Sequence, residues 1–128
     1  MILIDTNILL TKFLDRESKD KEQAFIRSHL AEGSLVLLSS QFRDIHYVLR
    51  RHGFSESDVR MKLSCLQSAF KVLPLTSQAV MLAYSSPMGD FEDAILVEAC
   101  KEYHVASIYT ENAKDFVLSG LKIINALA

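Results

Sequence analysis

The sequence has few of the residues that mark linkers, disulfide frameworks or flexible tracts. Among its 128 residues there are four glycines, two prolines and two cysteines. We find no repeat and no low-complexity segment, so we expect one compact domain spanning residues 1–128. Cys65 and Cys100 lie far apart in helical stretches, outside any C-x-x-C pattern. This favours buried, reduced thiols over a disulfide or a zinc site.

A surplus of charge of one sign is also missing. Fourteen basic and sixteen acidic side chains give a formal net charge of −2, so no global positive field predicts binding to nucleic acid or to an anionic membrane. The apolar run at residues 1–4 meets Asp5 at once, and it is too short for a signal peptide or a membrane span. We therefore expect a cytoplasmic protein without a membrane partner, in which any nucleic-acid binding is local.

Short apolar runs alternate with helical periodicity along the chain. Strands are expected at residues 1–5, 35–38, 72–75, 106–109 and 121–124, and helices at residues 6–14, 20–31, 41–51, 55–70, 76–84 and from 90 onward. In the third helix Phe42, Ile45 and Leu49 recur at i, i+3 and i+7, and Gly53 follows where a helix-ending glycine is expected. The alternation predicts an α/β fold with a central parallel β-sheet.

Acidic residues follow several of the predicted strands. In an open parallel sheet the carboxyl ends of the strands meet at one crevice, where function gathers. The carboxylates near these ends are Asp5, Asp44, Asp90, Glu92, Asp93, Glu111 and Asp115. Carboxylates within a few ångströms repel each other, so either some have raised pKa values or a hard cation binds among them. Mg²⁺ or Mn²⁺ suits an all-oxygen site of this type.

Each acid also has a purely structural explanation. Asp5 is a suitable N-cap for the helix that follows it, and the helix dipole favours acids in a first turn such as the one after Asp90. Asp44 lies one position off the apolar stripe of its helix, where a solvated carboxylate is the default. Asp115 could form a weak surface ion pair. The helix containing Asp93, however, is apolar nearly all round, and a buried helix with an acidic tip favours a site.

Four segments, taken in order, carry a shared pattern. They are the start at residues 2–10 (Ile-Leu-Ile-Asp-Thr-Asn-Ile-Leu-Leu) and the segments at residues 44–51, 90–95 and 109–116. Together they resemble the PIN domain family over residues 1–124, in particular the small VapC-like toxins of toxin–antitoxin pairs. The resemblance implies a PIN-like three-layer fold and a metal-dependent endoribonuclease. It also implies an RNA substrate, a protein antitoxin as partner and a homodimer.

The resemblance further implies a set of site residues, with one or two Mg²⁺ or Mn²⁺ ions assisting phosphodiester hydrolysis. The implied catalytic acids are Asp5, Asp44, Asp93 and Asp115. The implied metal ligands are Asp5, Asp90, Asp93 and Asp115. The implied supporting side chains are Thr6, Asn7, Thr110 and Asn112.

Two positions depart from the family pattern. The second acid is usually Glu, whereas Asp44 has one methylene less reach and could act through a metal-bound water. The last motif commonly reads Thr-x-Asp, whereas Thr110 is followed here by Glu111 and Asn112, which leaves Asp115, Glu111 or no residue as the fourth acid. Asn112 can coordinate through its carbonyl but adds no charge. The alternative function is therefore a PIN fold that binds RNA or a protein without cleavage.

Arginines near the third helix are candidates for binding RNA phosphates. They are Arg43, Arg50 and Arg51, and the basic run continues to Arg60 and Lys62. An ordinary solvated helix face explains them equally well, because Glu56 and Asp58 interrupt the basic run. The sequence shows no recognisable aromatic platform for RNA bases, and its four histidines lack metal-ligand spacing.

Two other classes with an acid at a strand end fit poorly. A phosphatase of the haloacid-dehalogenase type needs a second Asp two residues after the first, where this chain has Asn7. A receiver-like signalling domain needs an acidic pair before the first helix and a phosphorylatable Asp after a central strand. Neither feature is evident.

Overall fold

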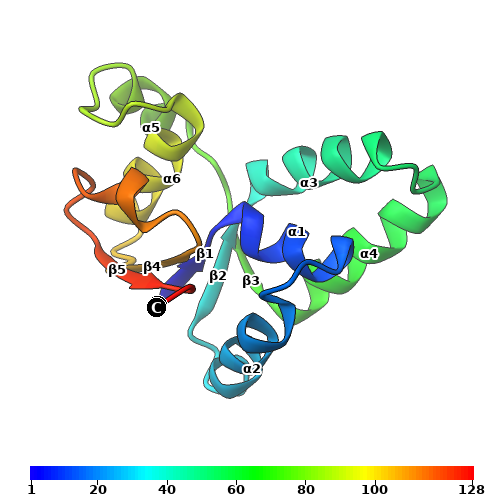
Figure 1. The fold of residues 1–128 in the computed structure, drawn as a ribbon. Helices are drawn as coiled ribbons and strands as arrows, with labels where there is room; N and C mark the ends of the chain where they lie inside the picture. Colours follow the sequence, from blue (N-terminus) through cyan, green and yellow to red (C-terminus); the bar gives the residue numbers. More distant parts are fainter.

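A five-stranded parallel sheet organises the protein. The computed structural model describes residues 1–128, with strands β1 (Ile2–Ile4), β2 (Leu35–Leu38), β3 (Lys71–Leu73), β4 (Ser107–Thr110) and β5 (Lys122–Asn125). They lie in the order β3-β2-β1-β4-β5 with every pair parallel. The first strand of the sequence therefore occupies the centre of the sheet, between β2 and β4 (Figure 1).

Helices cover both faces of this sheet. One face carries α1 (Thr6–Leu14), α2 (Lys19–Leu30), α3 (Ser39–Arg51) and α4 (Glu56–Ala69). The other carries α5 (Ser77–Ala83), α6 (Phe91–Glu102) and the short 3-10 helix η1 (Ala113–Phe116) (Figure 1). This arrangement confirms the predicted three-layer α/β fold.

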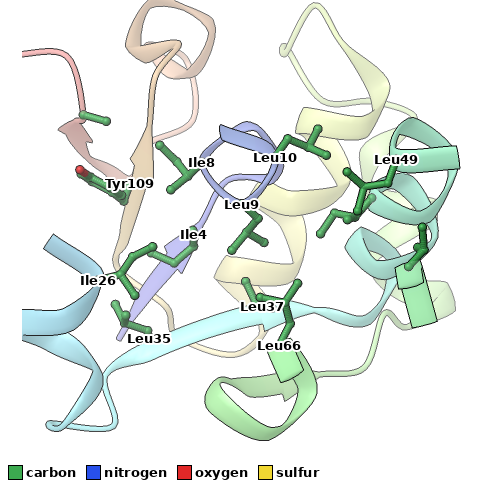
Figure 2. Packing of buried hydrophobic residues seen from close by; sticks show 13 residues of the cluster. Ile4, Ile8, Leu9, Leu10, Ile26, Leu35, Leu37, Leu49, Leu66 and Tyr109 are labelled. Carbon is green, nitrogen blue, oxygen red and sulfur yellow. The ribbon is translucent and has the colours of Figure 1, made fainter. Parts of the chain in front are cut away.

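Two apolar cores form because successive residues of a strand point to opposite faces. Ile4 and Leu37 belong to the core under α1 to α4, where they lie in one cluster with Leu9 of α1 (Figure 2). Leu3 and Val36 belong to the core under α5 and α6. Strands that are buried on both faces need apolar side chains at every position, which explains the continuous apolar runs in the sequence.

The predicted elements are found with small shifts at their ends. The helix at residues 6–14 and the strand at residues 35–38 have the predicted bounds. Helix α3 begins at Ser39, two residues earlier than predicted, because Gln41 accepts a hydrogen bond from the Leu38 N–H (2.7 Å) and closes the helix start. Gly53 follows α3 with φ at +91°, a left-handed conformation that glycine adopts without strain.

The cysteine prediction was right for one residue and wrong for the other. Both thiols are free, and Cys100 is buried in the core beneath α6. Cys65 is exposed, because its neighbour Leu66 takes the core-facing position and consecutive helix residues point about 100° apart. None of the helices combines the length and apolarity needed to cross a lipid bilayer.

Candidate active site

Asp5 lies where β1 ends, at the point where α1 and β4 meet. Its side chain is only 5% exposed. Its Oδ1 accepts a hydrogen bond from the Thr6 N–H (2.8 Å), which confirms the N-cap role, and its Oδ2 accepts one from the Thr110 hydroxyl (2.8 Å). Burial raises the pKa of Asp5, although these two hydrogen bonds lower it, and the charges of Glu111 and Asp115 raise it further.

The turn after β4 holds Thr110 in place. The fully buried Thr110 hydroxyl accepts a hydrogen bond from the Asn112 N–H (3.0 Å) while it donates to Asp5. The Asn112 carbonyl in turn accepts from the Asp115 N–H (2.9 Å) at the start of η1. Two of the predicted supporting residues thus shape the turn that carries Asp115, which is exposed.

Asp93 lies close to Asp5, in the first turn of α6. Burial, followed by repulsion from Asp5, Asp90 and Asp115, raises the pKa of Asp93 to about 7. Asp90 is the N-cap of this helix, because its Oδ1 accepts a hydrogen bond from the Asp93 N–H (3.0 Å). The structural explanation for Asp90 is therefore correct, and the same residue also lies beside the acidic site.

Two adjoining clefts share Asp93. The larger, about 680 Å³, lies between α1, α3 and α6 and is lined by Asp5, Asn7 and Asp44. The smaller, about 360 Å³, lies between the loop before α6 and η1 and is lined by Asp90 and Asp115. The predicted acids are thus divided between two clefts, with Asp93 at the boundary.

Asp44 lines the larger cleft from α3 and is not fully solvated. Partial burial raises its pKa, and the neighbouring Arg43 lowers it. On α6, Glu92 lines the same cleft, and its pKa is raised mainly by the negative charge of Asp44. Glu92 was named among the strand-end carboxylates but not among the implied site residues, and it also lines this cleft. Its sequence signal was its place in the acidic first turn of the last helix, where the family pattern singles out Asp93.

Gln41 ties the ends of β1 and β2 together beside Asp5. Its side chain is buried, and besides accepting from the Leu38 N–H it donates to the Ile4 carbonyl (2.8 Å) and to the Thr6 hydroxyl (3.2 Å). No sequence pattern predicted this role. The one available signal is a Gln at the third position of a helix, where it can form a capping box.

Glu111 lies in a buried polar cluster with α1 and α2 and does not line either cleft. Its Oε2 accepts hydrogen bonds from the hydroxyls of Thr11 (2.7 Å) and Ser18 (3.1 Å). Burial, together with the neighbouring Glu111 carboxylate, raises the pKa of the fully buried Glu22 to about 8. Burial opposes ionisation of Glu111 too, but the neighbouring Glu22 side chain and the Thr11 and Ser18 hydroxyls lower its pKa. Of the alternatives for the fourth acid, only Asp115 lines a cleft.

The three predicted arginines make different contacts. Arg43 lines the larger cleft. Arg51 donates to the Tyr47 hydroxyl (2.9 Å), and its guanidinium carbon lies 5.6 Å from the centre of the Tyr47 ring. Arg50 donates to the Phe54 carbonyl (2.8 Å), so its guanidinium closes the turn between α3 and α4.

The donor set suits a hard cation held by few protein ligands. No three Asp, Glu, His or Cys side chains converge closely enough to hold a metal ion by themselves, so the four predicted ligands are not gathered around one point. Asp5 and Asp93, however, lie close enough for Asp5 to raise the pKa of Asp93, and a divalent cation relieves such repulsion. Mg²⁺ commonly binds through one or two carboxylates and keeps several waters. Asp5 and Asp93 would supply two such carboxylates.

Several solved protein structures have a similar fold. FitAB bound to an IR36 DNA fragment has a TM-score of 0.75 at 16% identity, covering 100% of this chain and 96% of that one. VapBC2 from Rickettsia felis, bound to a promoter DNA fragment, has a TM-score of 0.76 at 14% identity, covering 98% of each chain. A toxin–antitoxin complex from Klebsiella pneumoniae has a TM-score of 0.73 at 18% identity, covering 98% of each chain. At these identities the likeness establishes the fold.

The sequence comparisons are consistent with this fold. The sequence matches no curated protein. The PIN domain family model matches residues 1–114, which include β1, the three helix-borne acids of the larger cleft and the first residues after β4. The expectation drawn from the four sequence segments is confirmed: the chain belongs to the PIN domain family.

Proposed function

We propose that this protein is a metal-dependent endoribonuclease and the toxin of a toxin–antitoxin pair. The observation that carries the proposal is the proximity of Asp5, at the end of the central strand, to Asp93, at the tip of a buried helix. Burial and repulsion raise the pKa values of both acids. Strained titratable groups at the carboxyl end of a parallel sheet are typical of functional sites.

In this proposal Asp5 and Asp93 hold one or two Mg²⁺ or Mn²⁺ ions, with Asp44 and Asp115 supporting them from the two clefts. When bound, such an ion binds a phosphate oxygen and lowers the pKa of a water molecule. Thr6 and Thr110 restrict the Asp5 carboxylate through one hydrogen bond to each oxygen. A carboxylate held in this way is already oriented before a ligand arrives.

We infer the partners from the resemblance to VapC-like toxins. The proposed substrate is RNA and the proposed inhibitor is a protein antitoxin, in a single-domain protein that acts in the cytoplasm as a homodimer. The similar FitAB and VapBC2 structures contain bound DNA, and the Klebsiella pneumoniae complex is a toxin–antitoxin pair. These relatives support the toxin role.

The experiment that tests the proposal is cleavage of a mixed RNA pool by purified protein. We expect cutting by the wild type with Mg²⁺ or Mn²⁺, and none with EDTA or in Asp93→Asn or Asp5→Asn. The matched control is Glu32→Gln, which neutralises an exposed acid in the turn before β2, at the opposite end of the sheet. Cleavage by folded Asp93→Asn at the wild-type rate would contradict the proposal.

One observation favours the second candidate function, a PIN fold that binds without cutting. The structure brings no three acids together closely enough to hold a metal, and Asp44 is shorter than the glutamate usual in the family. A wild type that neither cuts RNA nor binds Mn²⁺ by calorimetry would support this alternative.

A further inference from the structure

We propose that Tyr47, flanked by Arg43 and Arg51 on α3, is a stacking site for an unpaired base of the RNA. The inference rests on the proposed function and adds to it the part of the substrate that this face of α3 recognises. The sequence alone showed no recognisable aromatic platform.

The three side chains share one face of α3. They are spaced i, i+4 and i+8, and helix residues four apart lie one above the other. Arg43 and Tyr47 line the larger cleft together with Asp5 and Asp93. A molecule that contacts the Tyr47 ring therefore lies in the same cleft as the two acids proposed to hold the ion.

The Tyr47 ring is both exposed and held in orientation. The residue is 59% exposed, which is unusual for a large aromatic side chain. Arg51 donates to its hydroxyl and lies over its ring, so one side of the ring and its polar end are engaged. Such a cation–π pair limits the motion of the ring. The exposed part of the ring can contact a flat partner, and a ring already held in place loses little entropy when a base stacks on it.

Charge explains why the partner would be a nucleotide. Asp5, Asp44, Glu92 and Asp93 make the cleft acidic, and Arg43 is the one basic residue that lines it. A phosphate entering the cleft is therefore drawn to the α3 side, where Arg43 and Arg51 can bind it. Tyr47, between these two arginines, is then placed against the adjoining base. Bases in a duplex are stacked on their neighbours, so the site selects unpaired ones.

The chain offers a matched control for aromatic exposure alone. Tyr84 is 74% exposed and stacks on Phe91, with ring centres 5.5 Å apart. Neither ring lines either cleft, and no arginine accompanies them in the aromatic pairs of the structure. If exposed aromatic surface were sufficient, Tyr84 would contribute to RNA binding as much as Tyr47.

The test is fluorescence anisotropy with a labelled single-stranded oligoribonucleotide and with the same sequence as a duplex. Measurements use Mg²⁺ and an Asp93→Asn background, so that the RNA stays intact. We expect Tyr47→Leu to weaken single-strand binding about 5- to 100-fold, the range for losing one stacked base. Tyr47→Phe keeps the ring but loses the hydrogen bond from Arg51, so it should lose less affinity than Tyr47→Leu. Tyr84→Leu should stay within about twofold of the parent. Arg43→Gln should flatten the dependence of log affinity on log salt by about 0.7, the value for one phosphate contact on a single strand.

Three results would overturn the inference. The first is a Kd for Tyr47→Leu equal to that of its parent, which would assign this face of α3 to another partner, such as a protein. The second is an equal loss in Tyr84→Leu, and the third is no preference of the parent for single strands over duplex. Protein that binds RNA through Tyr47 but never cuts it would keep this inference and contradict the proposed function. Protein that cuts RNA, and whose RNA binding is unchanged by Tyr47→Leu, would contradict this inference and keep the proposed function.

Discussion

Replacing Asp93 with asparagine is expected to stabilise the protein when no divalent metal is present. The pKa of Asp93 is raised from 3.8 to about 7, first by burial and then by repulsion from Asp5 and the other nearby acids. The fold therefore favours the neutral form of this side chain. Asparagine has nearly the same shape as the neutral acid and cannot ionise.

The sign and size of the effect follow from linkage between pKa and stability. The pKa of Asp93 is higher in the folded state than in the unfolded state. Below pH 3.8 both states are protonated, so ionisation of Asp93 does not lower the free energy of unfolding. The loss of stability caused by this ionisation then grows with pH and reaches its full size above about pH 7. At 1.36 kcal/mol per pKa unit the whole shift corresponds to about 4 kcal/mol. Asp93 is only partly buried and water screens its charge, so we expect a gain of about 1–2 kcal/mol for Asp93→Asn at about pH 8.

Urea denaturation in EDTA measures this difference directly. We expect a higher midpoint with an unchanged m value for Asp93→Asn at about pH 8, and no difference at about pH 3.5. Glu32→Gln should change the free energy of unfolding by less than about 0.5 kcal/mol at either pH. With Mn²⁺ the order should reverse, because only the wild type gains the free energy of metal binding. Equal stabilities at about pH 8 in EDTA would refute the idea that Asp93 is strained by its neighbours, and with it the electrostatic reason for a cation.

Two further predictions concern the buried polar groups around the site. Gln41→Leu should cost about 2–4 kcal/mol in urea denaturation, because it leaves the buried Leu38 N–H and Ile4 carbonyl without partners; a loss below about 1 kcal/mol would contradict this. The raised pKa of Glu22 means that its contribution to stability is fully present below pH 4.5 and is lost as pH rises to about 8. Glu22→Gln should therefore flatten the fall in Tm over this range, and parallel curves for the two proteins would contradict the assignment of a proton to Glu22.

The strands and helices could be predicted because their signals are local. Continuous apolar runs mark strands buried on both faces, and i, i+3 and i+7 spacing marks the buried side of α3. The order of the strands has no such signal. It is this order that places β1 beside β4 and brings the Thr110 hydroxyl to Asp5, two residues that lie far apart in the sequence.

Which residues make up the site was harder to predict, because this also depends on contacts between distant parts of the sequence. Residue type alone could not show that Glu111 turns toward Thr11 and Glu22 while Asp115 lines a cleft. The hydrogen bonds of Gln41 join two strand ends through a side chain that looks unremarkable in the sequence. Tyr47 becomes a candidate RNA contact only once the fold shows that it lines the acidic cleft.

The central position of β1 affects how the protein behaves during its own synthesis. The ribosome makes β1 well before one of its two neighbours, β4. Until residues 107–110 emerge, one edge of β1 is unpaired and Asp5 lacks the hydroxyl that orients its second oxygen. A nascent chain therefore carries Asp5 without an assembled site. If the protein cuts RNA, this late assembly keeps the unfinished chain from attacking the messenger and ribosomal RNA around it.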